Sequence, residues 1–212
     1  MNATHPDVQM TEVDYDPFAT PELARAVPTT DAQRELWWAD QLGREASLAF
    51  NESVSLEIRG GLRVQEFQDS LLALSDRHES LRSTISGDGM DMLIAPRGAL
   101  QAEIVDLSAL ASAERERAAA ARREAAVLEP FDLVDGPLVR ATLLCLGSDR
   151  HEFILSAHHI VCDGWSFGVV ARDLMRIYAA LCSGRSAAEL PQADSFGDYA
   201  LAEHERAFAE QV

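Results

Sequence analysis

Lysine is missing from the 212-residue chain, and all 18 basic residues are arginine. Against them stand 35 acidic residues, which gives a formal net charge of −17. Binding to phosphates requires a basic face, so this balance argues against a nucleic-acid partner. The excess of acid instead predicts a soluble protein with an acidic surface.

Long apolar runs are also missing, since no stretch approaches the length of a membrane span. Residues 1–20 have neither a basic start nor an apolar centre, so we expect no signal peptide and no membrane partner. Cysteine is scarce: Cys145, Cys162 and Cys182 are odd in number and widely spaced. That argues against a disulfide framework and favours a reducing cytoplasm.

Three regions are distinguished by composition. Residues 1–27 are polar and proline-punctuated, and we interpret them as an acidic linker or leader. Residues 28–190 alternate between helical and strand-like patterns, and residues 191–212 can form a last helix. This order predicts an α/β fold, a mixed-sheet two-layer sandwich.

The periodicities locate the main elements. Helices are predicted near 31–42, 64–77, 109–128, 165–182 and 196–211, and strands near 50–60, 90–95, 102–105, 138–146 and 151–157. Thr29 or Thr30 is the expected cap of the first helix, and we expect both tryptophans of that helix, Trp37 and Trp38, to pack in the core.

The most informative stretch is the heptapeptide His158–Gly164, which contains two adjacent histidines, an aspartate and a glycine. It lies between a predicted strand and a predicted helix, where a sheet can aim side chains into an accessible loop. Imidazole exchanges a proton near neutral pH, although a buried structural histidine fits the spacing equally well. Adjacent residues of a strand point to opposite faces, and no zinc-ligand spacing lies nearby, so we predict no metal site.

This heptapeptide has the form H-H-x-x-x-D-G and, with Trp165 and Ser166, resembles the core motif of condensation domains of nonribosomal peptide synthetases. Those domains belong to the chloramphenicol-acetyltransferase-like superfamily of acyltransferases. Three other segments resemble further motifs of the family in the right order: Ala32–Arg34 with Trp37, Arg77–Ser83 and Phe131–Ala141. Ala157 and Cys162 depart from it, since methionine and serine are common at those positions.

The resemblance implies a chloramphenicol-acetyltransferase-like N-terminal lobe. Condensation domains have two similar lobes, and the motifs of the C-terminal lobe are not in this sequence. Residues 191–212 would then lead toward that second lobe. We expect the single lobe to be inactive by itself, because the family's substrate tunnel lies between the two lobes.

The implied reaction is amide formation between a carrier-bound acyl or peptidyl thioester and the amine of a carrier-bound aminoacyl group. The implied partners are donor and acceptor carrier domains, with the C-terminal lobe of the same domain. Their phosphopantetheine arms carry the substrates, and no cofactor is expected to bind directly.

The resemblance also gives the histidines different roles. His159 is expected to face the amine, either as a base or by holding it through a hydrogen bond. His158 is expected to be packed and hydrogen-bonded. Asp163 is expected to be structural, in an ion pair with Arg82, or alternatively with Arg34.

The residues after Asp163 are candidates for positions beside the substrate. Gly164 is expected either to allow close approach of the backbone or to adopt a positive φ. Trp165 and Ser166 begin a helix whose N–H groups would either stabilise an oxyanion or serve helix packing alone.

Two other functions remain open from the sequence. One is a non-catalytic lobe that binds carriers, and the other is a stand-alone acyltransferase that uses a thioester and a hydroxyl or amine acceptor. The intact heptapeptide disfavours the first, and the segment Arg77–Ser83 argues against the second.

Overall fold

The structure is a computed structural model that describes residues 23–187 and 190–209. Its helices in these ranges are α1 (Asp31–Asp40), α2 (Arg44–Leu48), α3 (Val64–Arg77), the 3-10 helix η1 (Glu79–Arg82), α4 (Ser112–Leu128), α5 (Gly164–Cys182) and α6 (Phe196–Ala209). The strands are β1 (Arg25–Pro28), β2 (Asn51–Arg59), β3 (Ser83–Ile85), β4 (Asp91–Ile94), β5 (Ala102–Asp106), β6 (Val139–Cys145) and β7 (Arg150–His158). The elements expected from the sequence patterns are found within a few residues of their expected ends, whereas β1 and α2 were not expected.

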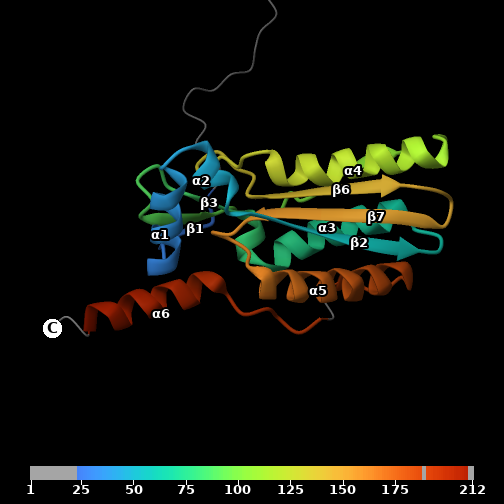
Figure 1. Ribbon diagram of the computed structural model, residues 1–212. Helices are drawn as coiled ribbons and strands as arrows, with labels where there is room; N and C mark the ends of the chain where they lie inside the picture. The colour runs from blue at the N-terminus through green and yellow to red at the C-terminus, as the bar shows by residue number, and fades with distance from the viewer. Residues whose placement is uncertain (1–22, 188–189, 210–212) are drawn as a thin grey trace, which may run out of the picture.

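A four-stranded sheet in the order β2-β7-β6-β5 is the centre of the fold (Figure 1). The β5–β6 pair is parallel, and the other two pairs are antiparallel. The expected mixed-sheet α/β architecture is thereby confirmed. In the register of β2 on β7, Asn51 lies opposite His158 and Glu52 opposite Ala157.

Helices cover both faces of this sheet, so it is the middle of three layers where the sequence pattern predicted two. Phe153 and Leu155 of β7 belong to the larger apolar cluster, which includes residues of α3 and α5. Ile154, between them, packs with Ala119 of α4 in a second cluster. Figure 1 shows α4 on one side of the strands and α5 on the other. Because both sets of alternating side chains are covered, residues 151–158 are buried without interruption.

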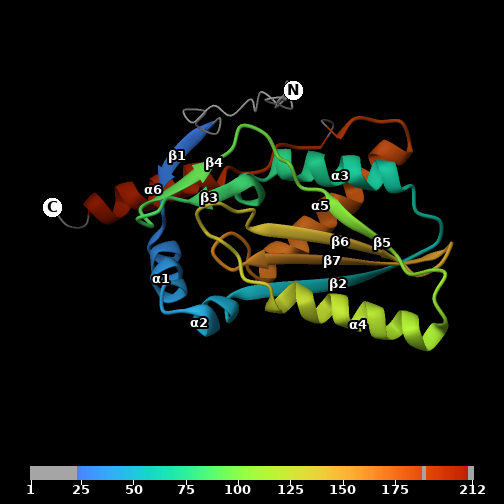
Figure 2. The same cartoon turned by 90° about the horizontal axis from the view of Figure 1, so that it is seen from above.

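A smaller antiparallel sheet, β1-β4-β3, lies at one end of the large one (Figure 2). Strand β1 crosses the expected boundary between residues 27 and 28, so residues 25–27 belong with the fold. The expected leader's residues 1–22 lie outside the described ranges. Helix α6 packs against β1 and η1, where Arg25 forms an ion pair of 2.9 Å with Asp198.

Helix α1 begins at a capping box, in which Thr30 and Gln33 each accept a hydrogen bond from the other's backbone N–H. Trp37 is buried, but Trp38 is 65% exposed. The expectation that both tryptophans pack in the core is therefore wrong for Trp38. The rest of the fold covers one side of α1, and neighbouring helix residues point roughly 100° apart.

Candidate active site

The heptapeptide connects β7 to α5 at the end of the large sheet nearest to the small sheet (Figure 1). His158 is the last residue of β7, and Gly164 is the first residue of α5. Gln33 of α1 donates a hydrogen bond of 3.0 Å from Nε2 to the carbonyl oxygen of Ile160. The segment Ala32–Arg34, which resembles a family motif, is thus hydrogen-bonded to the turn that contains the heptapeptide.

His158 lies in the interior with 0% of its surface exposed. Its Nδ1 accepts a hydrogen bond of 3.2 Å from the backbone N–H of Ile160, and its Nε2 lies 3.8 Å from Oδ1 of Asp40. Burial lowers the pKa of His158 to about 4. The ring is therefore neutral at pH 7 and serves the packing of the strand end.

His159 is the accessible imidazole of the pair, with 38% of its side chain exposed. Its backbone N–H donates a hydrogen bond of 2.8 Å to the carbonyl oxygen of Phe50. Its Nδ1 lies 2.5 Å from Oε1 of Glu52, which is on β2. Of the two adjacent rings, only that of His159 is available to a molecule that approaches the surface.

Sequence reasoning missed Glu52, although a signal was present. Side chains of β2 alternate between two faces, and Val54, Leu56 and Ile58 pack against the larger apolar cluster. Glu52 stands in the same row of that strand. A carboxylate in a row of apolar positions calls for a specific polar partner, and the partner is His159.

Asp163 forms the N-cap of α5. Its Oδ1 accepts hydrogen bonds from the backbone N–H of Ser166 at 2.8 Å and from the Ser166 hydroxyl at 2.5 Å. These bonds lower the pKa of Asp163. The residue is exposed, so it is a solvated helix cap and not a buried charge.

The expected ion pair between Asp163 and Arg82 does not form. Asp163 accepts hydrogen bonds at the start of α5, whereas Arg82 lies at the end of η1. The guanidinium of Arg82 donates hydrogen bonds to the carbonyl oxygens of Ser75, Asp76 and Ala95. Arg82 therefore joins the end of α3 to the residue that follows β4, which the sequence spacing did not reveal.

The alternate partner, Arg34, does not bind Asp163 either. It contacts Asp31 in the first turn of its own helix. The acid on α5 that does bind the segment Arg77–Ser83 is Asp173, whose Oδ2 lies 2.8 Å from Nε of Arg77 and 3.0 Å from Nε2 of His78. The expected link between this segment and α5 exists, but it is formed through different residues.

Gly164 does not have a positive φ, so that alternative was wrong. A Cβ atom at this position would meet nothing within 4 Å. Beside it, Trp165 is 84% exposed, while the Ser166 hydroxyl is engaged in the cap of α5. The start of α5 therefore presents open space and one large aromatic side chain.

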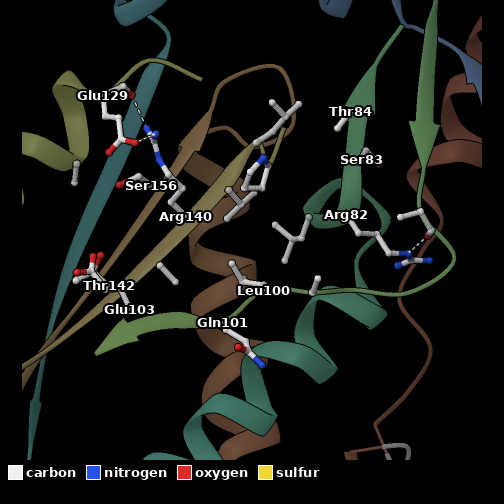
Figure 3. Close-up of a pocket in the computed structure, with 18 of the residues that line it drawn as sticks. Arg82, Ser83, Thr84, Leu100, Gln101, Glu103, Glu129, Arg140, Thr142 and Ser156 are labelled. Carbon is white, nitrogen blue, oxygen red and sulfur yellow. Dashed lines mark hydrogen bonds and ion pairs between the residues drawn. The ribbon is translucent and has the colours of Figure 1, made fainter. Parts of the chain in front are cut away.

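A cavity of about 700 Å³, shown in Figure 3, is lined by no residue of the heptapeptide. Arg140 and Ser156 line it from the large sheet, and Arg82 lines it from the other side. His159 does not line it. Arg140 binds Glu129 at 3.0 Å and Arg82 donates to backbone carbonyl oxygens, so these two arginines are engaged within the fold. The cavity and the accessible histidine are separate features of the described chain.

Two kinds of feature are absent from the described ranges. No helix there is long and apolar enough to cross a membrane. No cluster of three or more histidine, cysteine or acidic side chains there is arranged to hold a metal ion.

Comparison with known proteins finds, over most of the chain, the family that the sequence motifs resemble. The family model of the condensation domain matches residues 24–212. Malpinin synthetase of Mortierella alpina is 36% identical over 177 residues, which cover 82% of this chain and 2% of that protein. Isonitrile lipopeptide synthase of Mycobacterium tuberculosis is 33% identical over 207 residues, which cover 96% of this chain and 8% of that protein.

A solved structure extends the similarity to the fold. The starter condensation domain of the rhizomide synthetase RzmA superposes with a TM-score of 0.78 at 26% identity, covering 89% of this chain and 47% of that one. A mutant of that domain was solved in complex with C8-CoA and Leu-SNAC. The chain thus spans less than half of the solved domain and a small part of each synthetase. By its family match over residues 24–212, and by the fold that it shares with the solved domain, the chain belongs to the condensation-domain family.

Proposed function

We propose that the chain is the N-terminal lobe of a condensation domain that forms amide bonds in nonribosomal or hybrid polyketide-peptide synthesis. The donor is a carrier-bound acyl or peptidyl thioester, and the acceptor is the amine of a carrier-bound aminoacyl group. The observation that carries the proposal is the difference between the two histidines. His158 is fully buried, whereas His159 stands at the surface beside the open start of α5.

In this reaction the amine nitrogen attacks the thioester carbonyl carbon. The new C–N bond forms, the C–S bond breaks, and the proton lost by the amine is balanced by protonation of the departing thiolate. His159 faces the amine and either takes this proton and returns it to sulfur or holds the amine by a hydrogen bond. General acid–base help of this kind contributes roughly 10²–10⁴-fold to a rate.

The partners follow from the two substrates. Donor and acceptor carrier domains deliver them on phosphopantetheine arms, and the C-terminal lobe supplies the other wall of the tunnel. The related starter domain crystallised with C8-CoA and Leu-SNAC supports thioester substrates of this class. We place the protein in the cytoplasm, without nucleic-acid or membrane partners, and we propose that this lobe is inactive by itself.

The test is product formation by a polypeptide that contains this lobe together with its C-terminal lobe. A loaded donor carrier and a loaded acceptor carrier are mixed with it, and the amide product on the acceptor is measured by mass spectrometry. We expect His159→Ala to reduce the rate by at least about 10²-fold with an unchanged circular dichroism spectrum. His204→Ala, at an exposed position of α6, is the matched control and should retain full activity.

The same assay separates the other functions. Unchanged product formation by His159→Ala would remove this histidine from the mechanism. Carrier binding without any product from the unmodified two-lobed protein would favour a binding lobe, and transfer to a hydroxyl acceptor would favour an O-acyltransferase. Product formation by the 212-residue chain alone would refute the proposal that one lobe is insufficient.

A further inference from the structure

Two glutamates of β2 have different surroundings. Glu57 lies on the polar face of the strand and binds two arginines, Arg59 at 2.9 Å and Arg150 at 3.2 Å. Glu52 lies in the row of β2 whose other members pack against the apolar cluster, and it binds His159. Glu57 is thus an ordinary surface ion pair, whereas Glu52 is placed against the accessible histidine.

The backbone holds this contact from both sides. The β2–β7 register places Glu52 opposite Ala157, two residues before His159. The backbone N–H of His159 donates to the carbonyl oxygen of Phe50, two residues before Glu52. The two side chains therefore extend from backbone segments that are already hydrogen-bonded to each other, and neither is at the end of a free loop.

The contact selects one form of the neutral imidazole ring. An ionised carboxylate can only accept hydrogen bonds, so Nδ1 of His159, 2.5 Å from Oε1 of Glu52, carries the proton. The second ring nitrogen, Nε2, then has a free lone pair. A neutral histidine that is to accept a proton needs this arrangement, with one nitrogen held and the other vacant.

We propose that Glu52 is a positioning residue for His159, which fixes the Nδ1–H tautomer and leaves Nε2 as the nitrogen that faces the acceptor amine. The proposal rests on the proposed function for its catalytic part, and its tautomer part stands on the geometry alone. Glu52 does not touch the substrate and takes no proton. It acts by orienting the ring, as a carboxylate does for the histidine of a catalytic triad.

The first experiment measures the tautomer directly. The 212-residue chain is labelled with ¹⁵N-histidine, and the ¹⁵N chemical shifts of His159 report which ring nitrogen carries the proton when the ring is neutral. We expect protonated Nδ1 in the unmodified chain, and a substantial Nε2–H population in Glu52→Gln, since an amide can also donate to Nδ1. Glu57→Gln, on the opposite face of the same strand, should leave the His159 signals unchanged.

The second experiment measures kcat and KM in the two-lobed protein. We expect Glu52→Gln and Glu52→Ala to lower kcat by at least about tenfold with little change in KM, and Glu57→Gln to retain full activity. An unchanged His159 tautomer in Glu52→Gln would overturn the proposal. So would an unchanged kcat in that variant while His159→Ala is inactive. If His159→Ala is itself fully active, His159 has no part in the mechanism and the catalytic part of the proposal fails with it, while the tautomer measurement still decides whether Glu52 positions the ring.

Discussion

At the scale of single residues, two neighbouring imidazoles differ because a strand sends alternate side chains to opposite faces. His158 is enclosed by Phe50 and Phe131, and its pKa falls to about 4 because burial disfavours the charged ring. His159 leaves the strand on the other face and contacts Glu52. One dipeptide thus supplies a packing residue and an accessible one.

The buried ring predicts a loss of stability in acid. Between pH 6.5, its ordinary pKa, and about 4, the unfolded chain binds a proton at His158 that the folded chain does not. The free energy of unfolding therefore falls as the pH falls through this window, by up to about 3 kcal/mol from this residue. Urea denaturation at about pH 7 and about pH 5, on either side of the ordinary pKa, measures the loss.

His158→Asn is the informative variant, because its amide oxygen can still accept the hydrogen bond from the Ile160 N–H while it cannot be protonated. Burial also lowers the pKa of His78, and that contribution stays in both proteins. We expect the variant to be less stable at pH 7 but to lose less stability on acidification. Equal losses in the two proteins would contradict the assignment.

What the sequence indicated at this scale was the difference in burial between the two histidines and not the contacts of the motif. The strand period correctly separated His158 from His159. It could not reveal that Asp163 is satisfied by Ser166 three residues later, or that Arg82 is satisfied by backbone carbonyls. Such choices depend on which polar groups meet after folding. The apolar row that contains Glu52 could be recognised, but its partner follows a strand far along the chain.

At the scale of elements, the large sheet is buried because α4 covers the face that α3 and α5 leave open. Helix α4 is rich in alanine, glutamate and arginine, and Ala119 is its one fully buried residue in the described structure. It packs in a small cluster with Leu144 and Ile154. At Ala119 the helix lies close enough to the sheet that the contact admits only a small side chain.

Ala119→Leu should overfill this contact. Inserting atoms into a packed interface typically costs about 1–3 kcal/mol, and leucine has nearly the same helix propensity as alanine. Ala120, the next residue, is exposed, so Ala120→Leu should change the free energy of unfolding by less than about 0.5 kcal/mol. Thermal or urea denaturation of the pair isolates docking from helix formation, and equal stabilities would show that α4 is not held at Ala119.

The periodicity of the chain predicted these elements better than it predicted their partners. Helices α3, α4 and α5 were expected from their patterns, but β1 has only four residues and lies in a stretch that reads as a polar linker. Its place comes from pairing with β4, which lies far along the chain. Short strands are specified by such pairing, and local sequence carries little of that information.

At the scale of the whole molecule, the net charge is −17, and two of the three tryptophans are exposed at the surface. Trp38 is 65% exposed and Trp165 is 84% exposed, while Trp37 is buried. An acidic surface concentrates cations and depletes anions within about a Debye length, roughly 10 Å at 0.1 M salt. The local concentration of a small ionic quencher of tryptophan fluorescence therefore depends on the sign of its charge.

We expect caesium to quench the two exposed tryptophans more strongly at low salt than at about 1 M salt, and iodide to show the opposite trend. Acrylamide, which is neutral, is the control and should be insensitive to salt. The buried Trp37 should resist all three quenchers. Quenching by caesium and iodide that does not respond to salt would show that the net charge is not felt at these side chains.

The pairing of β2 with β7 also limits how the lengths of related lobes can vary. Glu52 reaches His159 because an even spacing along β2 keeps it in the row of Val54 and Leu56. Removing one residue between Glu52 and Val54 would turn the carboxylate to the other face of the sheet and separate it from the imidazole. An insertion in the turn at residues 147–149 leaves the side chains of β2 and β7 on the faces of the sheet that they now occupy. Relatives that keep this carboxylate are therefore free to gain or lose residues at the hairpin, but not along this strand.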